Sequence, residues 1–395
     1  MPTENTLKKL RRVAVEPIVI IGSGLAGYGL ARELRKLDKE VPLVMICSDS
    51  GDFYSKPMLS NALANGKDGA TLVNTPAQKI ATQLNLRLIP GVRVQAIDRA
   101  AQRVSWAGGE QTYSRLVLAT GADPIRLPLQ GDGAATVLSV NDLGDYARFR
   151  EKLVGARRVT ILGGGLIGCE FANDLVKGGY APTIYDPSPL PLGRLLPPGV
   201  AGFFRDRLAA AGVSWQLEDS VARVEGGPGA YGLTTAQGKT GEADVVLSAV
   251  GLRPRLGLAQ EAGLTVNRGI VVDRQLATSD ANIFALGDGA EVAGLVLPFV
   301  LPIMQASRAL AATLAGTPTA VVYPAMPVAV KTPACPVVVC PPAPGVQGGW
   351  EERVEETGAR ALFKDGAGNL LGFALAGDGV QEKQALATQV PPVLV

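Results

Sequence analysis

The sequence predicts an α/β protein with two units of parallel sheet covered by helices. Two glycine patterns, at residues 22–27 and 163–168, both read G-x-G-x-x-G. Each follows a short β-branched run and opens a stretch rich in alanine and leucine, which is the order strand, turn, helix. Continuous apolar runs, typical of strands buried on both faces of a parallel sheet, recur at residues 17–21, 116–119, 159–162, 245–247 and 283–286.

The glycine patterns predict two dinucleotide sites. In such a turn the first glycine allows the tight bend, the second lets the backbone approach a pyrophosphate, and the third permits close helix packing. The phosphates then lie at a helix N-terminus. Both units are therefore expected to be Rossmann-like, and the pair of sites indicates electron transfer. The expected contacts are Gly22, Gly24 and Gly27 in the first turn and Gly163, Gly165, Leu166, Ile167 and Gly168 in the second.

An acidic residue is expected about 20 residues after each pattern, where it meets a ribose hydroxyl. A helix from Leu25 towards Lys39 and a strand over residues 43–46 lead to Asp49, with a register uncertainty of one residue. In the second unit the strand at residues 183–186 ends at Asp186. A carboxylate there accepts from both ribose hydroxyls and repels a 2′-phosphate, so NADH is expected rather than NADPH.

The composition excludes several classes of protein. A chain of 395 residues is too long for one core, and a net charge of +2 gives no bias towards nucleic acid. The most apolar later stretch, residues 294–304, is shorter than a membrane span and is interrupted by Pro298 and Pro302, so no membrane insertion is expected. Residues 1–15 form a polar, basic leader without a signal-type apolar segment, and the cytoplasm is expected.

The cysteine and histidine content points to a cofactor. Cys47, Cys169, Cys335 and Cys340 form no C-x-x-C pair, and the odd separation of the last two predicts opposite faces of an extended segment, so no disulfide and no metal site are expected. The chain has no histidine, which removes the commonest general base and the commonest neutral metal ligand. The chemistry must therefore come from a bound cofactor.

Two further motifs carry a family resemblance. Residues 118–122, L-A-T-G-A, look like the A-T-G motif of flavoproteins with two dinucleotide sites, and residues 282–288, N-I-F-A-L-G-D, look like their second FAD motif. With both glycine patterns, in this order, they resemble the pyridine nucleotide-disulfide reductase superfamily over about residues 17–320. The resemblance implies a glutathione-reductase-like fold, FAD at the first pattern and NAD at the second. Further implied cofactor contacts are Ala119, Thr120, Gly121, Gly251 and Asp288.

One branch of this superfamily fits better than the others. Residues 52–60 stand where the disulfide branch has its redox cysteines, and they contain no sulfur nucleophile. They resemble instead the Y-x-R-P-x-L-S stretch of flavoproteins that reduce small iron-sulfur or rubredoxin carriers. Residues 168–175 and 326–336 are similar to the rubredoxin-NAD(+) reductase family.

This branch implies three catalytic residues. Related ferredoxin reductases place a lysine after the L-S, where it pairs with a glutamate near flavin N5, whereas here Asn61 follows Ser60. Lys56, at the arginine position beside Pro57, is expected to do that work and to contact the flavin. Glu170 is expected near N5, in the first turn of its helix where the dipole favours a carboxylate. Lys331, on an apolar strand, is expected to approach the flavin pyrimidine and to stabilise negative charge.

The resemblance implies an NADH-dependent enzyme that passes electrons through noncovalent FAD to rubredoxin, one at a time, in a transient complex. Two alternatives stay open: a ferredoxin or flavorubredoxin reductase, and a redox-switched flavoprotein resembling apoptosis-inducing factor. The pathway, alkane degradation or disposal of oxygen species, stays open too, as do the docking patch and the oligomeric state.

The expected domain boundaries follow from the motif order. The basic leader precedes a discontinuous FAD-binding domain at residues 16–125 and 252–321, into which the NAD-binding domain at 126–251 is inserted. Residues 322–395 are expected to form a small C-terminal α+β domain, with strand-like runs at 328–330, 336–339 and 371–375.

Overall fold

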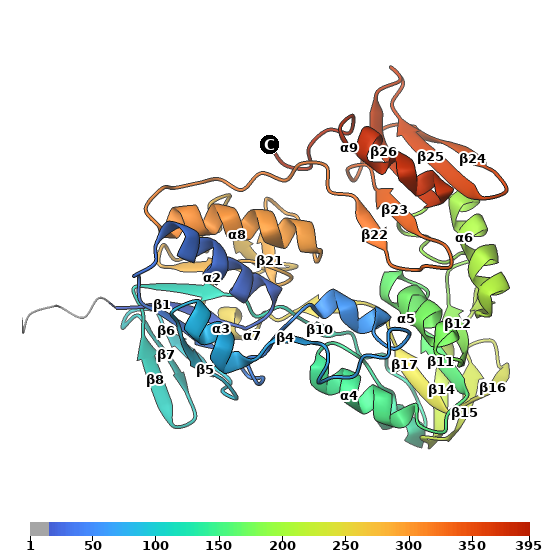
Figure 1. The fold of residues 1–395 in the computed structure, drawn as a ribbon, viewed down its shortest axis with the longest axis horizontal. Coiled ribbons are helices and arrows are strands. Elements are labelled where there is room, and N and C mark those ends of the chain that lie inside the picture. Colours follow the sequence, from blue (N-terminus) through green and yellow to red (C-terminus); the bar gives the residue numbers. More distant parts are fainter. Residues whose placement is uncertain (1–15) are drawn as a thin grey trace, which may run out of the picture. The chain divides into compact units, whose positions relative to one another are not determined.

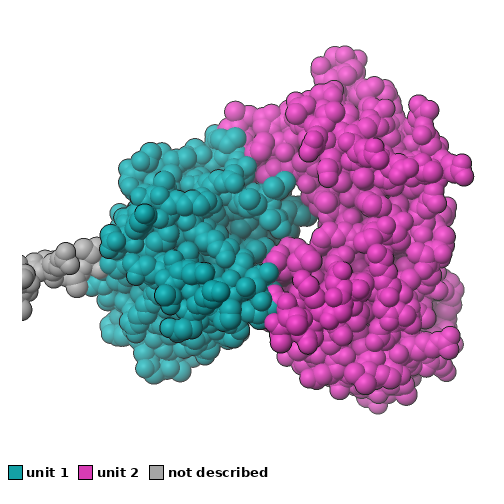
Figure 2. All heavy atoms as spheres, in the orientation of Figure 1, with its two compact units in different colours: residues 1–54, 73–122, 254–322 teal, residues 55–72, 123–253, 323–395 magenta. Residues whose placement is uncertain are grey.

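The structure is a computed structural model that describes residues 16–395, so the expected leader lies outside the described residues. The chain divides into two compact units, shown in teal and magenta in Figure 2. Unit 1 holds the described residues up to 54 together with 73–122 and 254–322, and unit 2 holds 55–72, 123–253 and 323–395. Residues 55–72, which fall inside the expected range 16–125, thus group with unit 2.

Unit 1 is centred on a five-stranded parallel sheet in the order β20-β9-β1-β2-β5. Its strands are β1 (Ile18–Ile21), β2 (Leu43–Ile46), β5 (Arg87–Ile89), β9 (Arg115–Leu118) and β20 (Ile283–Ala285). All residues of β1 and β2 are buried, which explains their continuous apolar runs. The helices are α2 (Leu25–Leu37), α3 (Ala77–Gln83), α7 (Gly257–Glu261) and α8 (Val300–Leu314), and Figure 1 shows α2 beside α8.

Small sheets complete unit 1. The strands β6 (Ala96–Asp98), β7 (Arg103–Trp106) and β8 (Gly109–Thr112) form an antiparallel meander, β3 (Phe53–Tyr54) pairs with β4 (Val73–Thr75), and β19 (Ile270–Val272) pairs with β21 (Ala290–Val292). A further pair, β10 (Ala122–Pro124) and β18 (Leu252–Pro254), stands where the chain passes between the units.

Unit 2 contains a second parallel sheet, in the order β13-β12-β11-β17. Its strands are β11 (Arg158–Leu162), β12 (Ala181–Asp186), β13 (Ser214–Leu217) and β17 (Val245–Ser248), and its helices are α4 (Leu143–Lys152), α5 (Leu166–Lys177) and α6 (Pro198–Ala211). Asp142 caps α4 by accepting from the Asp145 N–H at 2.8 Å.

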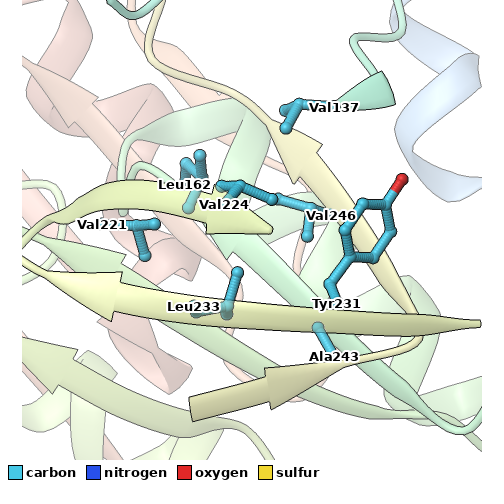
Figure 3. Packing of buried hydrophobic residues seen from close by; sticks show 8 residues of the cluster. All are labelled: Val137, Leu162, Val221, Val224, Tyr231, Leu233, Ala243 and Val246. Carbon is cyan, nitrogen blue, oxygen red and sulfur yellow. The ribbon is translucent and has the colours of Figure 1, made fainter. Parts of the chain in front are cut away.

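An antiparallel meander packs on this sheet. It consists of β14 (Val221–Gly227), β15 (Ala230–Thr235) and β16 (Thr240–Ala243). Figure 3 shows the apolar cluster that joins the meander to β11 and β17, with Leu162 and Val246 from the sheet and Tyr231 and Leu233 from β15. Burying such side chains is the main favourable term that holds the two layers together.

The last part of unit 2 is a five-stranded antiparallel sheet in the order β22-β23-β26-β25-β24. Its elements are β22 (Val328–Val330), β23 (Val337–Cys340), β24 (Gly349–Val354), β25 (Gly358–Lys364), β26 (Leu370–Gly377), the 3₁₀ helix η3 (Asp378–Glu382) and α9 (Lys383–Ala387). The three strands expected here are confirmed, whereas β24 and β25 were not expected.

This C-terminal sheet packs against α6 of the nucleotide-binding part (Figure 1). Glu352 of β24 accepts a hydrogen bond at 3.0 Å from the Val200 N–H in the first turn of α6. A β-carbon on Gly199 would lie 2.6 Å from the same carboxylate, so a glycine makes this approach possible. The glutamate supplies the anionic partner that the N-terminus of α6 lacks in its own sequence.

All four cysteines are buried and free in the structure. Across residues 16–395, no helix is both long and apolar enough to cross a membrane.

Candidate functional site

The first glycine turn joins β1 to α2 and has the geometry of a dinucleotide site. Gly22 has a φ of +116°, and a β-carbon there would lie 2.2 Å from the Ala119 carbonyl oxygen, so only glycine fits. A β-carbon on Gly27 would lie 1.9 Å from the Gly22 carbonyl oxygen, which explains the close approach of helix and strand. A β-carbon on Gly24 would meet nothing within 4 Å, so the middle of the turn is open to a ligand.

The second turn, between β11 and α5, repeats this arrangement. Gly163 has a φ of +106°, and a β-carbon on Gly168 would lie 2.0 Å from the Gly163 carbonyl oxygen. Gly165 is as open as Gly24. Leu166 and Ile167 begin α5, and Ile167 is exposed. Neither α2 nor α5 has a side-chain cap or an acidic residue in its first turn, so their first N–H groups suit a phosphate.

Each carboxylate expected to bind ribose is hydrogen-bonded to its glycine turn. In unit 1 Asp49 accepts from the Ser23 hydroxyl at 2.7 Å and from the Gly51 N–H at 3.0 Å. In unit 2 Asp186 accepts from the Gly164 N–H at 2.6 Å and from the Ser188 N–H at 2.8 Å. The expected spacing therefore does place both carboxylates beside the turns.

The remaining expected cofactor residues lie at the same ends of the parallel strands. Ala119, Thr120 and Gly121 follow β9, and Asp288 lies half-buried in the turn after β20, so β1, β9 and β20 bring these positions to one sheet edge. Gly251, with a φ of +114°, follows β17 at the corresponding edge of the second sheet.

Glu170 is fully buried on α5 and receives three hydrogen bonds. The Ser60 hydroxyl and the Lys331 ammonium both donate to its Oε2, and the Lys331 backbone N–H donates to Oε1 at 2.8 Å. The expectation that Glu170 occupies the first turn of α5 is wrong, because α5 begins at Leu166 and has no acidic residue in that turn. Its carboxylate is held by these donors instead of by the helix dipole.

The structure brings Lys331 to Glu170. Lys331 lies one residue beyond β22, and its side chain is one-third exposed. Lys56 and Pro57 begin the 3₁₀ helix η1 (Lys56–Asn61) and are half-buried. The Glu170 carboxylate thus joins Ser60, from the same 3₁₀ helix as Lys56, to Lys331.

Sequence reasoning missed two residues on the same face of α5. Asn173 accepts from the Ala334 N–H at 3.1 Å, and Asp174 accepts from the N–H groups of Leu63 and Ala64 at 2.9 and 3.0 Å. Both side chains are buried. The available signal was their spacing, three and four residues after Glu170, which places all three on one helix face.

Comparison with known families agrees with this geometry. Residues 16–313 match the family described as pyridine nucleotide-disulphide oxidoreductase, and residues 320–390 match a family described as the rubredoxin binding C-terminal domain. The chain belongs to the pyridine nucleotide-disulphide oxidoreductase family. This membership implies FAD and NADH, and the two open glycine turns fit both groups.

The chain is also similar to individual proteins of this family. The chain is 49% identical over 381 residues to the rubredoxin-NAD(+) reductase of Alcanivorax borkumensis, covering 96% of this chain and all of the relative. It is 41% identical over 375 residues to the nitric oxide reductase FlRd-NAD(+) reductase of Aeromonas hydrophila, covering 95% and 96%. Among solved structures, the ferredoxin reductase for the CYP199A2 system from Rhodopseudomonas palustris has a TM-score of 0.86 at 26% identity, covering 95% of each chain.

Proposed function

We propose that this chain oxidises NADH and passes the electrons through noncovalent FAD to rubredoxin, one at a time. The observation that carries the proposal is the joint presence of two open dinucleotide turns and a C-terminal segment of the rubredoxin-binding type. The 49% identity to a rubredoxin-NAD(+) reductase over nearly the whole chain supports the same acceptor. The absence of cysteine from residues 52–60 argues against a thiol relay.

The two cofactors divide between the two sheets. FAD would be held in unit 1 by the first glycine turn, Asp49, Ala119, Thr120, Gly121 and Asp288, and NADH in unit 2 by the second turn, Asp186 and Gly251. Bound FAD supplies the redox chemistry, since it accepts a hydride and gives up electrons singly. The protein then has to bind and orient the partners, which needs no histidine.

The cluster of Ser60, Glu170 and Lys331 is the proposed catalytic centre of the chain, together with Lys56. Lys331 pairs with the buried Glu170 carboxylate and keeps one-third of its side chain exposed, so it can present positive charge to a ligand. Ser60 links the segment carrying Lys56 and Pro57 to the same carboxylate. We assign to Lys331 and Lys56 the stabilisation of negative charge on the flavin, and to Glu170 the orientation of both segments.

The cytoplasm is the proposed compartment, in line with four thiols that are all free. The domain boundaries at residues 125, 251 and 321 are part of the same proposal. The complex with rubredoxin is expected to be transient and small, about 1,200 Å² or less, as in other electron-transfer encounters.

The decisive experiment is stopped-flow mixing of NADH-reduced protein with oxidised rubredoxin and, separately, with a ferredoxin. Faster oxidation of the flavin by rubredoxin supports the proposal. Faster oxidation by ferredoxin would favour a ferredoxin reductase, and a flavorubredoxin should be included because of the Aeromonas relative. A long-lived reduced complex with no acceptor turnover would favour a redox-switched binding protein.

A further inference from the structure

Burying the carboxylate of Asp174 costs the folded protein free energy. Its side chain is 2% exposed, and it lies on the same face of α5 as the fully buried Glu170, one turn further along. Like charges four residues apart on a helix repel each other, and a buried carboxylate also loses its hydration. Burial raises the pKa of the Asp174 carboxyl, as this loss of hydration demands. The hydrogen bonds that the Asp174 carboxylate accepts must therefore offset this loss.

Asp174 holds the segment that follows η1. Its two oxygens accept from the consecutive N–H groups of Leu63 and Ala64, and Ser60, three residues earlier, donates to Glu170. The stretch 60–64 is thus fixed to α5 at two points one helical turn apart. Two attachments define the direction of a segment as well as its distance, so they also determine where η1 and Lys56 lie along the helix.

Asn173 does the same for the segment after β22. Its side-chain oxygen accepts from the Ala334 N–H at 3.1 Å, and Glu170 accepts from the Lys331 N–H at 2.8 Å. Asn173 is 3% exposed. In this second segment the Thr332 hydroxyl also donates to the Cys335 carbonyl at 2.6 Å, which restricts the conformations of the loop.

We propose that Asn173 and Asp174 are positioning residues, which set Lys331 and the η1 segment in place by fixing each at a second point on α5. The inference rests on the proposed function, in which Lys331 and Lys56 act on the flavin. Its mechanical basis is that α5 starts at the second glycine turn, so one rigid helix carries the nucleotide turn and both catalytic segments. Loss of one attachment would leave the nucleotide site intact and misplace the groups that act on the flavin.

The test compares Asp174→Asn, Asp174→Ala and Asn173→Ala with the unmodified holoprotein. We expect NAD⁺ binding, measured by fluorescence titration, to change less than twofold, because the glycine turn is untouched. The limiting rate of flavin reduction by NADH should fall by about tenfold or more, since small misplacements of reacting groups cost that much. The visible absorption envelope of the bound flavin should shift as well. Asn173→Asp keeps the accepting oxygen but adds a buried charge beside Glu170 and Asp174, so it should restore only part of the rate lost in Asn173→Ala.

Glu291→Gln is the matched control. Glu291 is also a buried carboxylate, 5% exposed, and accepts from the Gly269 N–H at 3.0 Å within unit 1, whereas α5 belongs to unit 2. It should lower the melting temperature without changing the rate or the flavin spectrum. The inference is overturned if folded, flavin-loaded Asn173→Ala and Asp174→Asn are reduced at the unmodified rate, or if Glu291→Gln slows reduction equally. Should Asp174→Ala fail to fold, the other two variants decide.

Failure of the proposed function and failure of this inference would give different results. Flavin reduction by NADH involves no protein acceptor, so a wrong acceptor would leave the comparison intact, whereas an unmodified protein without flavin would remove the proposed function itself.

Discussion

The backbone N–H of Gly164 donates a 2.6 Å hydrogen bond to Asp186, so the middle glycine of the nucleotide turn orients the carboxylate expected to bind ribose. In unit 1 the corresponding link runs from the hydroxyl of Ser23 to Asp49. A β-carbon on Gly164 would lie 3.3 Å from the Asp186 side chain. Glycine is therefore favoured here, because it lets the carboxylate approach the backbone N–H.

Asp186→Ala is predicted to weaken discrimination between NADH and NADPH. The unmodified protein should prefer NADH, because the carboxylate accepts from ribose hydroxyls and repels a 2′-phosphate. The variant loses both effects and also the bond that orders Gly164, so the KM for NADH should rise by about tenfold. The ratio of kcat/KM for the two nucleotides measures the change. Equal efficiency of the unmodified protein with both nucleotides would contradict the assignment of Asp186.

Lys331→Met is predicted to destabilise the protein more than Lys331→Met combined with Glu170→Gln. Removing the lysine alone leaves a buried carboxylate without its cation, and breaking a buried pair is more costly than replacing both members. Because one-third of the Lys331 side chain is exposed, the loss should be about 1–3 kcal/mol. Denaturant unfolding of the two single variants and the double variant measures it. A double variant less stable than either single variant would show that the pair is not coupled in this way.

The cysteines are predicted to be dispensable for turnover, because the flavin stores both electrons. A variant with all four changed to Ser should still reduce its acceptor at saturating NADH. Cys169 lies near the second glycine turn, where its thiol donates to the Gly164 carbonyl at 3.3 Å, and Cys47 lies near the first, where its thiol donates to the Asp49 carbonyl at 3.8 Å; serine preserves a donor at both positions. Cys169→Ala should therefore raise the KM for NADH, with Cys340→Ala as the control. Complete loss of turnover in a folded, flavin-loaded quadruple variant would revive a thiol mechanism.

Asp244 is predicted to contribute to stability at neutral pH and to lose this contribution in acid. Hydrogen bonds from Arg158 lower the pKa of its carboxyl from 3.8 to about 2. A group whose pKa is depressed in the folded state stabilises the fold above its unfolded pKa, and the effect disappears as pH falls through the folded value. Asp244→Asn should thus lower the melting temperature at pH 7, and the difference should shrink between about pH 4 and pH 2. A difference independent of pH would contradict this account.

Association with rubredoxin is predicted to be fast and sensitive to salt. Rubredoxin is expected to be a small acidic iron protein. Basic residues near the flavin would therefore attract it and steer the encounter. Raising ionic strength should slow association and leave reduction of the flavin by NADH nearly unchanged, because salt screens chiefly exposed charges. Stopped-flow rates at several salt concentrations distinguish the two steps. An equal salt effect on both steps would argue against steering.

Local patterns predicted much of the fold. The glycine turns, the buried parallel strands and the two carboxylates Asp49 and Asp186 were predictable because each depends on residues within about 30 positions of one another. The β24 and β25 strands were not expected, since β24 is an edge strand with four consecutive exposed residues after Trp350 and has no apolar alternation. An edge strand with charged side chains carries little of the usual signal.

The surroundings of Glu170 could not be predicted in the same way. Its donors, Ser60 and Lys331, lie 110 and 161 residues away in sequence, and only the packed fold brings them to one carboxylate. Sequence reasoning selected Glu170 and Lys331 from family resemblance but placed the glutamate in the first turn of its helix, which contains no acidic residue. Asp174 was missed because a buried carboxylate that binds backbone N–H groups has no partner visible in the sequence.

The hydrogen bond from the Val200 N–H to Glu352 limits where segments of this chain can be exchanged in a chimeric protein. Exchange of residues 320–390 between reductases is an obvious route to a new acceptor preference, yet that segment supplies the anionic cap of α6. A chimera joined at residue 320 would leave the cap and its helix from different parents. The exchangeable module therefore includes α6 with its Gly199. Grafts that carry this helix should give stable hybrids, whereas the shorter graft should weaken the nucleotide-binding domain.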